Sequence, residues 1–235
     1  MKPVFTLLFC LVTLTGILAQ SNAGTNDYNN AQQFMNDAYG RPLYMHTEYA
    51  VEGTPFFSNE YCSANLKIRK GKSYTGIKVK LNLQENLVIY DAGDGNEMAA
   101  VTPVERIEFL NCNDASKNKV LISGYPPVDK QDVSSFYVLL DSGSVQLLKN
   151  ISVTYRDTKY YGSTNTTRIF EQKENYYAYS AEKGITRLSK ENSAVLAVFN
   201  SKKSELSKFI AANDLKCKRE DDLVKLFRYY NTISR

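Results

Sequence analysis

SYTGIKVKLNL, at residues Ser73–Leu83, gives the clearest structural signal in this chain, because apolar and polar residues alternate along it. The alternation is strict from Ile77 to Leu81, where Lys78 and Lys80 stand between the apolar residues. A period of two turns one face toward a core and the other toward water. The stretch therefore predicts a strand in a half-buried antiparallel sheet.

Ten further segments have a strand-like pattern and are separated by turn formers such as Gly93, Asn96 and Gly143. The segment Ser123–Asp129 is predicted to be a loop, because its two prolines offer no donors to a sheet. The further predicted strands are Ala64–Lys70, Leu87–Asp91, Met98–Val101, Val104–Leu110, Val120–Ser123, Phe136–Asp141, Val145–Tyr155, Arg168–Gln172, Tyr176–Ser180 and Gly184–Leu188. Consecutive short strands predict an antiparallel meander arranged as a sandwich, a roll or a half-barrel.

Near Ser189 the spacing of apolar residues changes from that of a strand to that of a helix. A helix is predicted to begin at Glu220–Asp222, because acidic residues in a first turn favour the positive end of the helix dipole. Two shorter helices are expected near residues 194–199 and 206–210. The apolar positions of the last helix are Leu223, Leu226, Phe227 and Tyr230. The predicted fold class is α+β, a mostly antiparallel β meander followed by a small C-terminal helical bundle.

The first residues have the pattern of a secretory signal peptide. Lys2 precedes an apolar run at Val4–Leu18, and small residues follow at Ala19 and Ala23. The run is shorter than the roughly 20 residues that cross a bilayer, so no transmembrane segment is expected after its removal. Cleavage after Ala19 is favoured and cleavage after Ala23 is the alternative. The predicted division is a signal peptide at 1–19, a loosely ordered segment at 20–52, a β-rich domain at 53–188, and a helical region at 189–235 that packs on it.

Charge and composition narrow the range of partners. The formal net charge is +4, and basic residues are interleaved with acidic ones, which argues against binding nucleic acid. The chain has 17 tyrosines and no tryptophan, a composition typical of half-buried strands. Export predicts a location in the periplasm, the cell envelope or the extracellular space. No cofactor is expected.

Cysteine usage fits an oxidising compartment. Cys10 lies in the signal peptide, so the mature chain would keep Cys62, Cys112 and Cys217. At most one intramolecular disulfide can form from three cysteines. Cys62 and Cys112 are the favoured pair because both flank strand-like segments, and three buried free thiols are the alternative.

Several segments resemble a group of uncharacterised secreted proteins of Bacteroidota-type bacteria. The resemblance is carried by GTPFFSNEY at Gly53–Tyr61, GKSYTGI at Gly71–Ile77, KLN at Lys80–Asn82, EDDLVKL at Glu220–Leu226 and YYN at Tyr229–Asn231. These are strand, turn and helix patterns and contain no reactive motif. The resemblance implies a Gram-negative cell envelope and carries no activity with it.

No group of reactive residues predicts a catalytic site. His46 is the single histidine, which excludes metal sites built on two or three imidazoles. The oxygen donors of Asp91–Glu97 fit a hairpin turn better than a Ca²⁺ loop, because the alternate-position acids of such a loop are missing. An acid-residue hydrolase would need two facing carboxyl groups. Candidates for that pair are Glu60, Glu85, Glu105 and Glu108, and none of them is favoured.

Tyrosine pairs suggest a weak alternative, because exposed rings can act as platforms for a sugar or a peptide. The candidates are Tyr160, Tyr161, Tyr176, Tyr177 and Tyr179. Three functions therefore stay open. The first is a non-catalytic exported cell-envelope protein that contacts envelope proteins or surface glycans. The others are a carbohydrate or small-ligand binding module that uses exposed tyrosines, and an acid-residue hydrolase.

Overall fold

The computed structural model describes residues 31, 33–43, 50–69, 71–93, 95–162 and 165–234. Within these residues the strands are β1 (Arg41–Pro42), β2 (Ala50–Glu52), β3 (Cys62–Ile68), β4 (Ser73–Asn82), β5 (Leu87–Asp91), β6 (Glu97–Ala99), β7 (Val104–Asn111), β8 (Val120–Ile122), β9 (Tyr137–Asp141), β10 (Gln146–Thr158), β11 (Thr167–Ser180) and β12 (Gly184–Arg187). The helices are the 3₁₀ turn η1 (Ala115–Lys117), α2 (Asn192–Ala197), α3 (Lys203–Ala212) and α4 (Glu220–Ile233).

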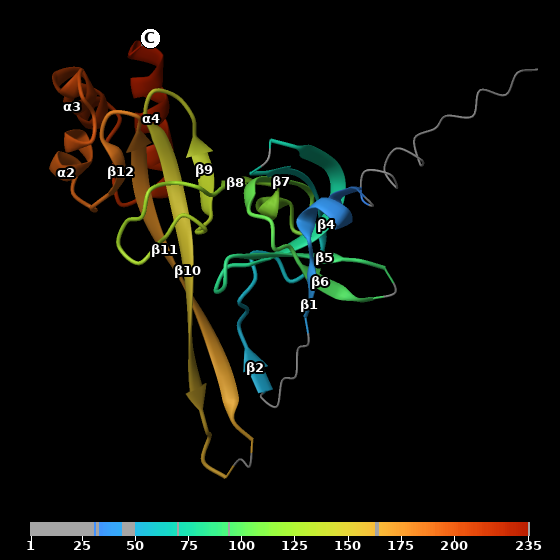
Figure 1. Ribbon diagram of the computed structural model, residues 1–235. Helices are drawn as coiled ribbons and strands as arrows, with labels where there is room; N and C mark the ends of the chain where they lie inside the picture. The colour runs from blue at the N-terminus through green and yellow to red at the C-terminus, as the bar shows by residue number, and fades with distance from the viewer. Residues whose placement is uncertain are drawn as a thin grey trace, which may run out of the picture.

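The strands form one open sheet in the order β1-β6-β5-β4-β3-β7-β8-β9-β10-β11-β12 (Figure 1). All neighbours on this path are antiparallel, and only β2 departs from it by pairing in parallel with β11. In β4 the side chains of Ile77, Val79 and Leu81 are buried and Lys78 is exposed, as the alternation predicts. The α+β class with a mostly antiparallel sheet and C-terminal helices is confirmed.

A short helical segment at residues 33–38 packs on the first half of the sheet. Phe34 is fully buried, and its ring lies edge-on to Tyr74 and Tyr90 at 5.3 and 5.2 Å between centroids. The prediction of a loosely ordered segment over residues 20–52 was therefore wrong for residues 33–43. Ala38 is also fully buried and Met35 packs against the same cluster, so a few apolar side chains dock this helix beside two tyrosine rings. The predicted signal peptide lies outside the described residues.

Strands β10 and β11 form one long hairpin that extends away from the rest of the molecule as a twisted ribbon (Figure 1). Every residue of β10 pairs with β11, from Gln146 opposite Tyr179 to Thr158 opposite Thr167. The prediction of two separate strands over residues 168–180 was wrong. The predicted gap between the two strands, Lys173–Asn175, is exposed or half-exposed in β11. No core covers either face there, so apolar and polar residues need not alternate.

The helices pack against one end of this hairpin, where β9, β10 and β11 meet α4. Asn231 of α4 reaches the turn between β9 and β10. Its Oδ1 accepts from the Val145 N–H and the Ser144 hydroxyl at 3.1 Å each, and its amide donates to the Val145 carbonyl at 2.9 Å. Gly143 is required here, because a Cβ at that position would collide with the Asn231 side chain.

None of the described helices has the length and apolar character that crossing a membrane requires.

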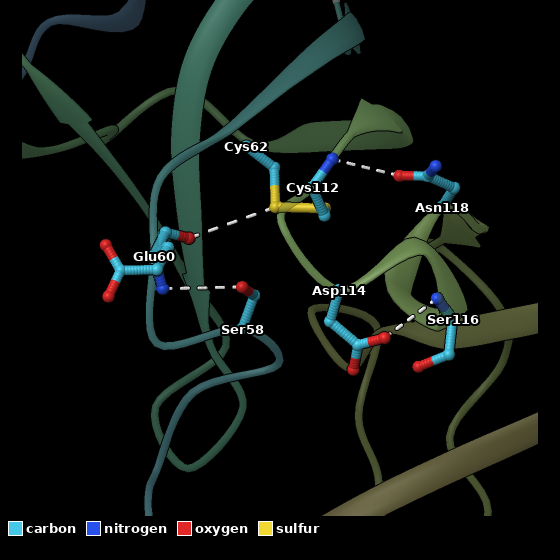
Figure 2. Close-up of a disulfide and its surroundings, with 7 residues drawn as sticks. All are labelled: Ser58, Glu60, Cys62, Cys112, Asp114, Ser116 and Asn118. Atoms are coloured by element: carbon cyan, nitrogen blue, oxygen red, sulfur yellow. Dashed lines mark hydrogen bonds between the residues drawn. A yellow bond between two sulfur atoms is a disulfide. The ribbon is translucent and has the colours of Figure 1, made fainter.

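A disulfide joins Cys62, at the start of β3, to Cys112, directly after β7 (Figure 2). The two strands are antiparallel neighbours, and the Cα atoms of the cysteines lie 4.6 Å apart. The Cys112 N–H donates to Asn118 Oδ1 at 3.0 Å, which fixes the loop that follows. Strand pairing therefore brings together two cysteines that are 50 residues apart in sequence.

Candidate functional site: a polar groove beside the ribbon

A concavity of about 520 Å³ lies over one face of the β10–β11 ribbon, and we call it the polar groove. Residues directly opposite each other in an antiparallel pair share a face. Asn150 lies opposite Asn175 and Ser152 opposite Lys173, and Tyr177 lies two residues beyond Asn175 on the same strand. The ribbon therefore lines the floor of the groove with amide, hydroxyl, ammonium and phenol groups.

The wall of the polar groove is the loop between β8 and β9. A tight turn at Val128–Gln131 closes with two backbone hydrogen bonds, and Asp129 takes a left-handed conformation with φ +53° that aspartate tolerates. Farther along, hydrogen bonds from Ser134 hold the pKa of Asp132 below its usual range. These contacts are local, so this loop positions Asp129 without a secondary-structure element of its own.

Hydrogen bonds connect the wall to the floor. The Tyr177 hydroxyl donates to Asp129 Oδ2 at 2.9 Å and lies 3.2 Å from Gln131 Oε1. Gln131 Nε2 donates to Asn150 Oδ1 at 3.2 Å. Arg187 of β12 donates to Asn175 Oδ1 at 2.7 Å and lies 3.5 Å from Asp129 Oδ2. The network holds its side chains in fixed directions before any ligand arrives, which lowers the entropic cost of binding.

Two cationic groups in the polar groove have no counter-ion among the residues that the structure describes. Lys130 and Lys173 line it, and neither forms an ion pair with any described residue. Arg187 adds a third cation, and Asp129 is the one carboxylate among the described lining residues. The groove is therefore net positive and offers unpaired charge to an acidic ligand.

A tyrosine cluster supports the wall from beneath. Tyr137 packs edge-on between Tyr125 and Tyr177, with centroids 5.4 and 5.5 Å apart, and Tyr179 contacts Tyr125 at 4.9 Å. Burial raises the pKa of Tyr137 to about 12 and also raises the pKa of Tyr177. The Tyr137 hydroxyl is buried and has no hydrogen-bond partner in the described part of the chain, whereas Tyr177 is satisfied.

This contrast predicts opposite results for two matched substitutions. Tyr177→Phe is expected to lower the free energy of unfolding by about 2 kcal/mol, because Asp129 loses a donor to a charged acceptor. Tyr137→Phe is expected to leave it unchanged or to raise it by up to about 1 kcal/mol, because an unsatisfied buried hydroxyl is removed. Urea unfolding of both variants measures the difference. Equal losses would contradict the assigned hydrogen bonds.

The five tyrosines proposed as a ligand platform do not lie together. Tyr160 and Tyr161 are exposed and lie between the end of β10 and the start of β11, and Tyr161 is fully accessible. At the other end, Tyr177 is 1% exposed, Tyr179 packs on Tyr125, and the Tyr176 hydroxyl donates to Glu220 Oε2 at 3.0 Å. Of the five, only Tyr177 lines the polar groove, where it contributes its hydroxyl and not an open ring face.

The four glutamates considered for a hydrolase are also dispersed. Glu60 and Glu85 are exposed and line different concavities, and Glu105 and Glu108 lie on β7. A carboxylate pair that sequence reasoning missed is Glu174 and Glu220, which contact Lys149 Nζ at 3.2 and 2.7 Å.

Burial alone would lower the pKa of Lys149, but the nearby carboxylates outweigh burial and hold the pKa above its usual value. Glu220 belongs to α4, whereas Lys149 and Glu174 belong to the ribbon, so the cluster ties the two together.

The remaining candidates are His46, the Asp91–Glu97 turn and Cys217. His46 lies outside the described residues, and so does Asp94 of the Asp91–Glu97 turn, where the Gly93 N–H donates to Asp91 Oδ1 at 2.9 Å. Among the described residues no group of three or more His, Cys, Asp or Glu side chains could hold a metal ion. Cys217 is a buried free thiol, and burial raises its pKa to about 11, which keeps it protonated and unreactive.

Comparison with protein-family models, curated protein sequences and solved structures gave no match. The geometry is therefore the basis for a functional conclusion. Sequence reasoning did not find the groove residues Asp129, Gln131 and Arg187. One signal was present in Asn150, an amide residue within the apolar run of β10 that is 5% exposed and must find partners when buried.

Proposed function

We propose that this chain is a non-catalytic exported protein of the cell envelope, and that it acts by contact with a protein partner through the polar groove and the adjoining ribbon. The observation that carries the proposal is the polar groove itself, where a fixed hydrogen-bonding network stands beside two unpaired lysines. Its described lining contains no histidine or cysteine and a single carboxylate. That composition suits recognition better than acid–base chemistry with two carboxylates.

The ribbon supports a role in contacts because it extends beyond the body of the molecule (Figure 1). Residues 154–157 of β10 are exposed, so both faces of the ribbon reach solvent there. The helical region holds the base of this ribbon through Asn231 and through the Lys149 ion pairs. A rigidly anchored, projecting element is a suitable surface for a partner. The signal-peptide pattern and the resemblance to secreted proteins support a location outside the cytoplasm.

A second candidate function is the binding of a carbohydrate or another small polar ligand in the polar groove. The observation that favours it is the mixture of amide, phenol and guanidinium groups that the network holds in place. Such a ligand would be held by hydrogen bonds and not by stacking on exposed tyrosine rings, because the Tyr177 ring is buried. The two functions differ in the size of the bound molecule.

Site-specific photo-crosslinking in cells of the source organism tests the contact role. A photoreactive residue in place of Thr154, at the exposed border of the groove, is expected to give a protein adduct in the envelope fraction. The yield of this adduct should fall at least fivefold when the Lys173→Glu substitution is added. It should persist with Lys208→Glu, the same charge change on an exposed position of α3.

Two results would count against the proposal. One is an adduct that forms equally well from a photoreactive residue placed at Lys208, since that would indicate non-specific proximity. The other is recovery of the protein with its original amino terminus in the cytosol, which would remove the exported location.

A further inference from the structure

We infer that β10 accepts an added strand along its free edge from Asn150 to Thr158, and that the added strand belongs to a partner polypeptide whose side chains alternate between acidic and apolar. The inference rests on the proposed contact function and specifies the partner. Three features of the ribbon support it: an open edge, weak edge protection, and two faces of different chemistry.

The first feature is the open edge. On one side β10 pairs with β11 along its whole length, but on the other side it pairs with β9 only at Leu147, Leu148 and Lys149. Beyond Lys149 no described strand lies on that side. The Asn150 side chain marks the point of departure, because its Nδ2 donates to the Phe136 carbonyl at 3.2 Å as the chain before β9 leaves the sheet. From there on, alternate residues of β10 turn their N–H and C=O groups outward.

The second feature is weak protection of this edge, because its two charged residues, Arg156 and Asp157, are already held in ion pairs with β11. Edge strands are commonly protected by proline, lysine or a bulge. Residues 150–158, with the sequence NISVTYRDT, contain no proline and no lysine, and the one irregularity in the pairing with β9 falls before them, at Leu147 and Leu148. Four of these residues are β-branched. Between the stretches where β12 and β2 pair with β11, the described ribbon has only two strands. Two strands alone are marginally stable in water, so a third strand along this edge would stabilise that part of the ribbon.

The third feature is the difference between the two faces. Val153 and Tyr155 lie on one face, where Tyr155 is 47% exposed and contacts Phe170 at 6.0 Å between ring centroids. Ser152 and Lys173 lie opposite each other on the other face, which is the floor of the net-positive groove. Side chains of an added strand would alternate between these faces. An apolar side chain therefore fits beside Tyr155, whose ring also stacks with the Arg168 guanidinium at 4.1 Å. An acidic side chain fits beside Lys173 and not farther along the same face, where Glu171 lies opposite Thr154.

The experiment measures binding of synthetic peptides to the full mature protein by calorimetry. The probe is an acetylated and amidated nonapeptide in which valine and glutamate alternate. Two peptides serve as controls, one with all backbone amides methylated and one with lysine in place of glutamate. The parent peptide is expected to bind, and each control is expected to bind at least tenfold more weakly. Lys173→Glu should lower the affinity for the parent peptide tenfold, whereas Lys208→Glu should change that affinity less than twofold.

Each result has a defined meaning. Equal binding of the methylated peptide would overturn strand addition while leaving the polar groove as the contact site of the proposed function. Absence of binding by the parent peptide would overturn the inference. The proposed function would still be tested independently by photo-crosslinking from Thr154. A stable dimer in sedimentation equilibrium that the parent peptide dissociates would place a second copy of this chain on the edge, and would also overturn it.

Discussion

Replacing both Cys62 and Cys112 by alanine is expected to lower the free energy of unfolding by about 4 kcal/mol, the largest stability effect we predict. The disulfide closes a loop of 50 residues, and a cross-link of that span restricts the unfolded chain by roughly this amount. Both cysteines are buried, so some packing is lost as well. Such a loss is a large part of the stability of a domain of this size.

Denaturant unfolding with and without a reducing agent provides the measurement. Reduction should bring the wild-type protein close to the double variant and should leave the double variant unchanged. A Cys217→Ala variant is the matched control, because it removes a buried thiol and keeps the disulfide. Free alkylation of Cys62 and Cys112 in unreduced mature protein, detected by mass spectrometry, would contradict the pairing.

The second large effect is expected from Asn231→Ala. This substitution removes the hydrogen bonds that join α4 to the turn before β10, and it leaves the N–H and C=O of buried Val145 without partners. Unsatisfied buried backbone groups cost about 1–3 kcal/mol each, so a total loss of about 3 kcal/mol is expected. Thermal and urea unfolding measure it.

Thr232→Ala is the control for Asn231→Ala. The Thr232 hydroxyl is exposed, and among the described residues it bonds only to the Arg228 carbonyl one turn earlier. Its removal should therefore change stability by less than about 0.5 kcal/mol. Similar losses for the two variants would show that Asn231 does not hold the turn and that the ribbon is anchored in another way.

The sheet was predictable where a core covers one face of each strand. Ile77, Val79 and Leu81 alternate with polar residues because their side chains are buried and the intervening ones are not. Strand β11 lacks this alternation, because the stretch from Glu171 to Glu174 is exposed on both faces and no burial constrains its sequence. The helix that carries Phe34 was missed because its short apolar signal stands among asparagine and glutamine.

The polar groove was not predictable for a different reason. Asp129, Asn150 and Arg187 are 58 residues apart at most, and they meet only because the loop before β9 folds over β10, β11 and β12. Sequence patterns report burial and period, and they do not report which loop covers which face. A buried amide such as Asn150 shows that a polar partner must exist without showing which one.

Amide hydrogen exchange shows whether the open edge of β10 binds an extended partner segment. Exchange is followed in the mature protein with and without the alternating valine–glutamate peptide. Alternate amides within residues 150–158 are expected to exchange at least tenfold more slowly with the peptide bound, while the amides of α3 keep their rates. Peptide binding that leaves exchange in residues 150–158 unchanged would show that the peptide does not add to this edge.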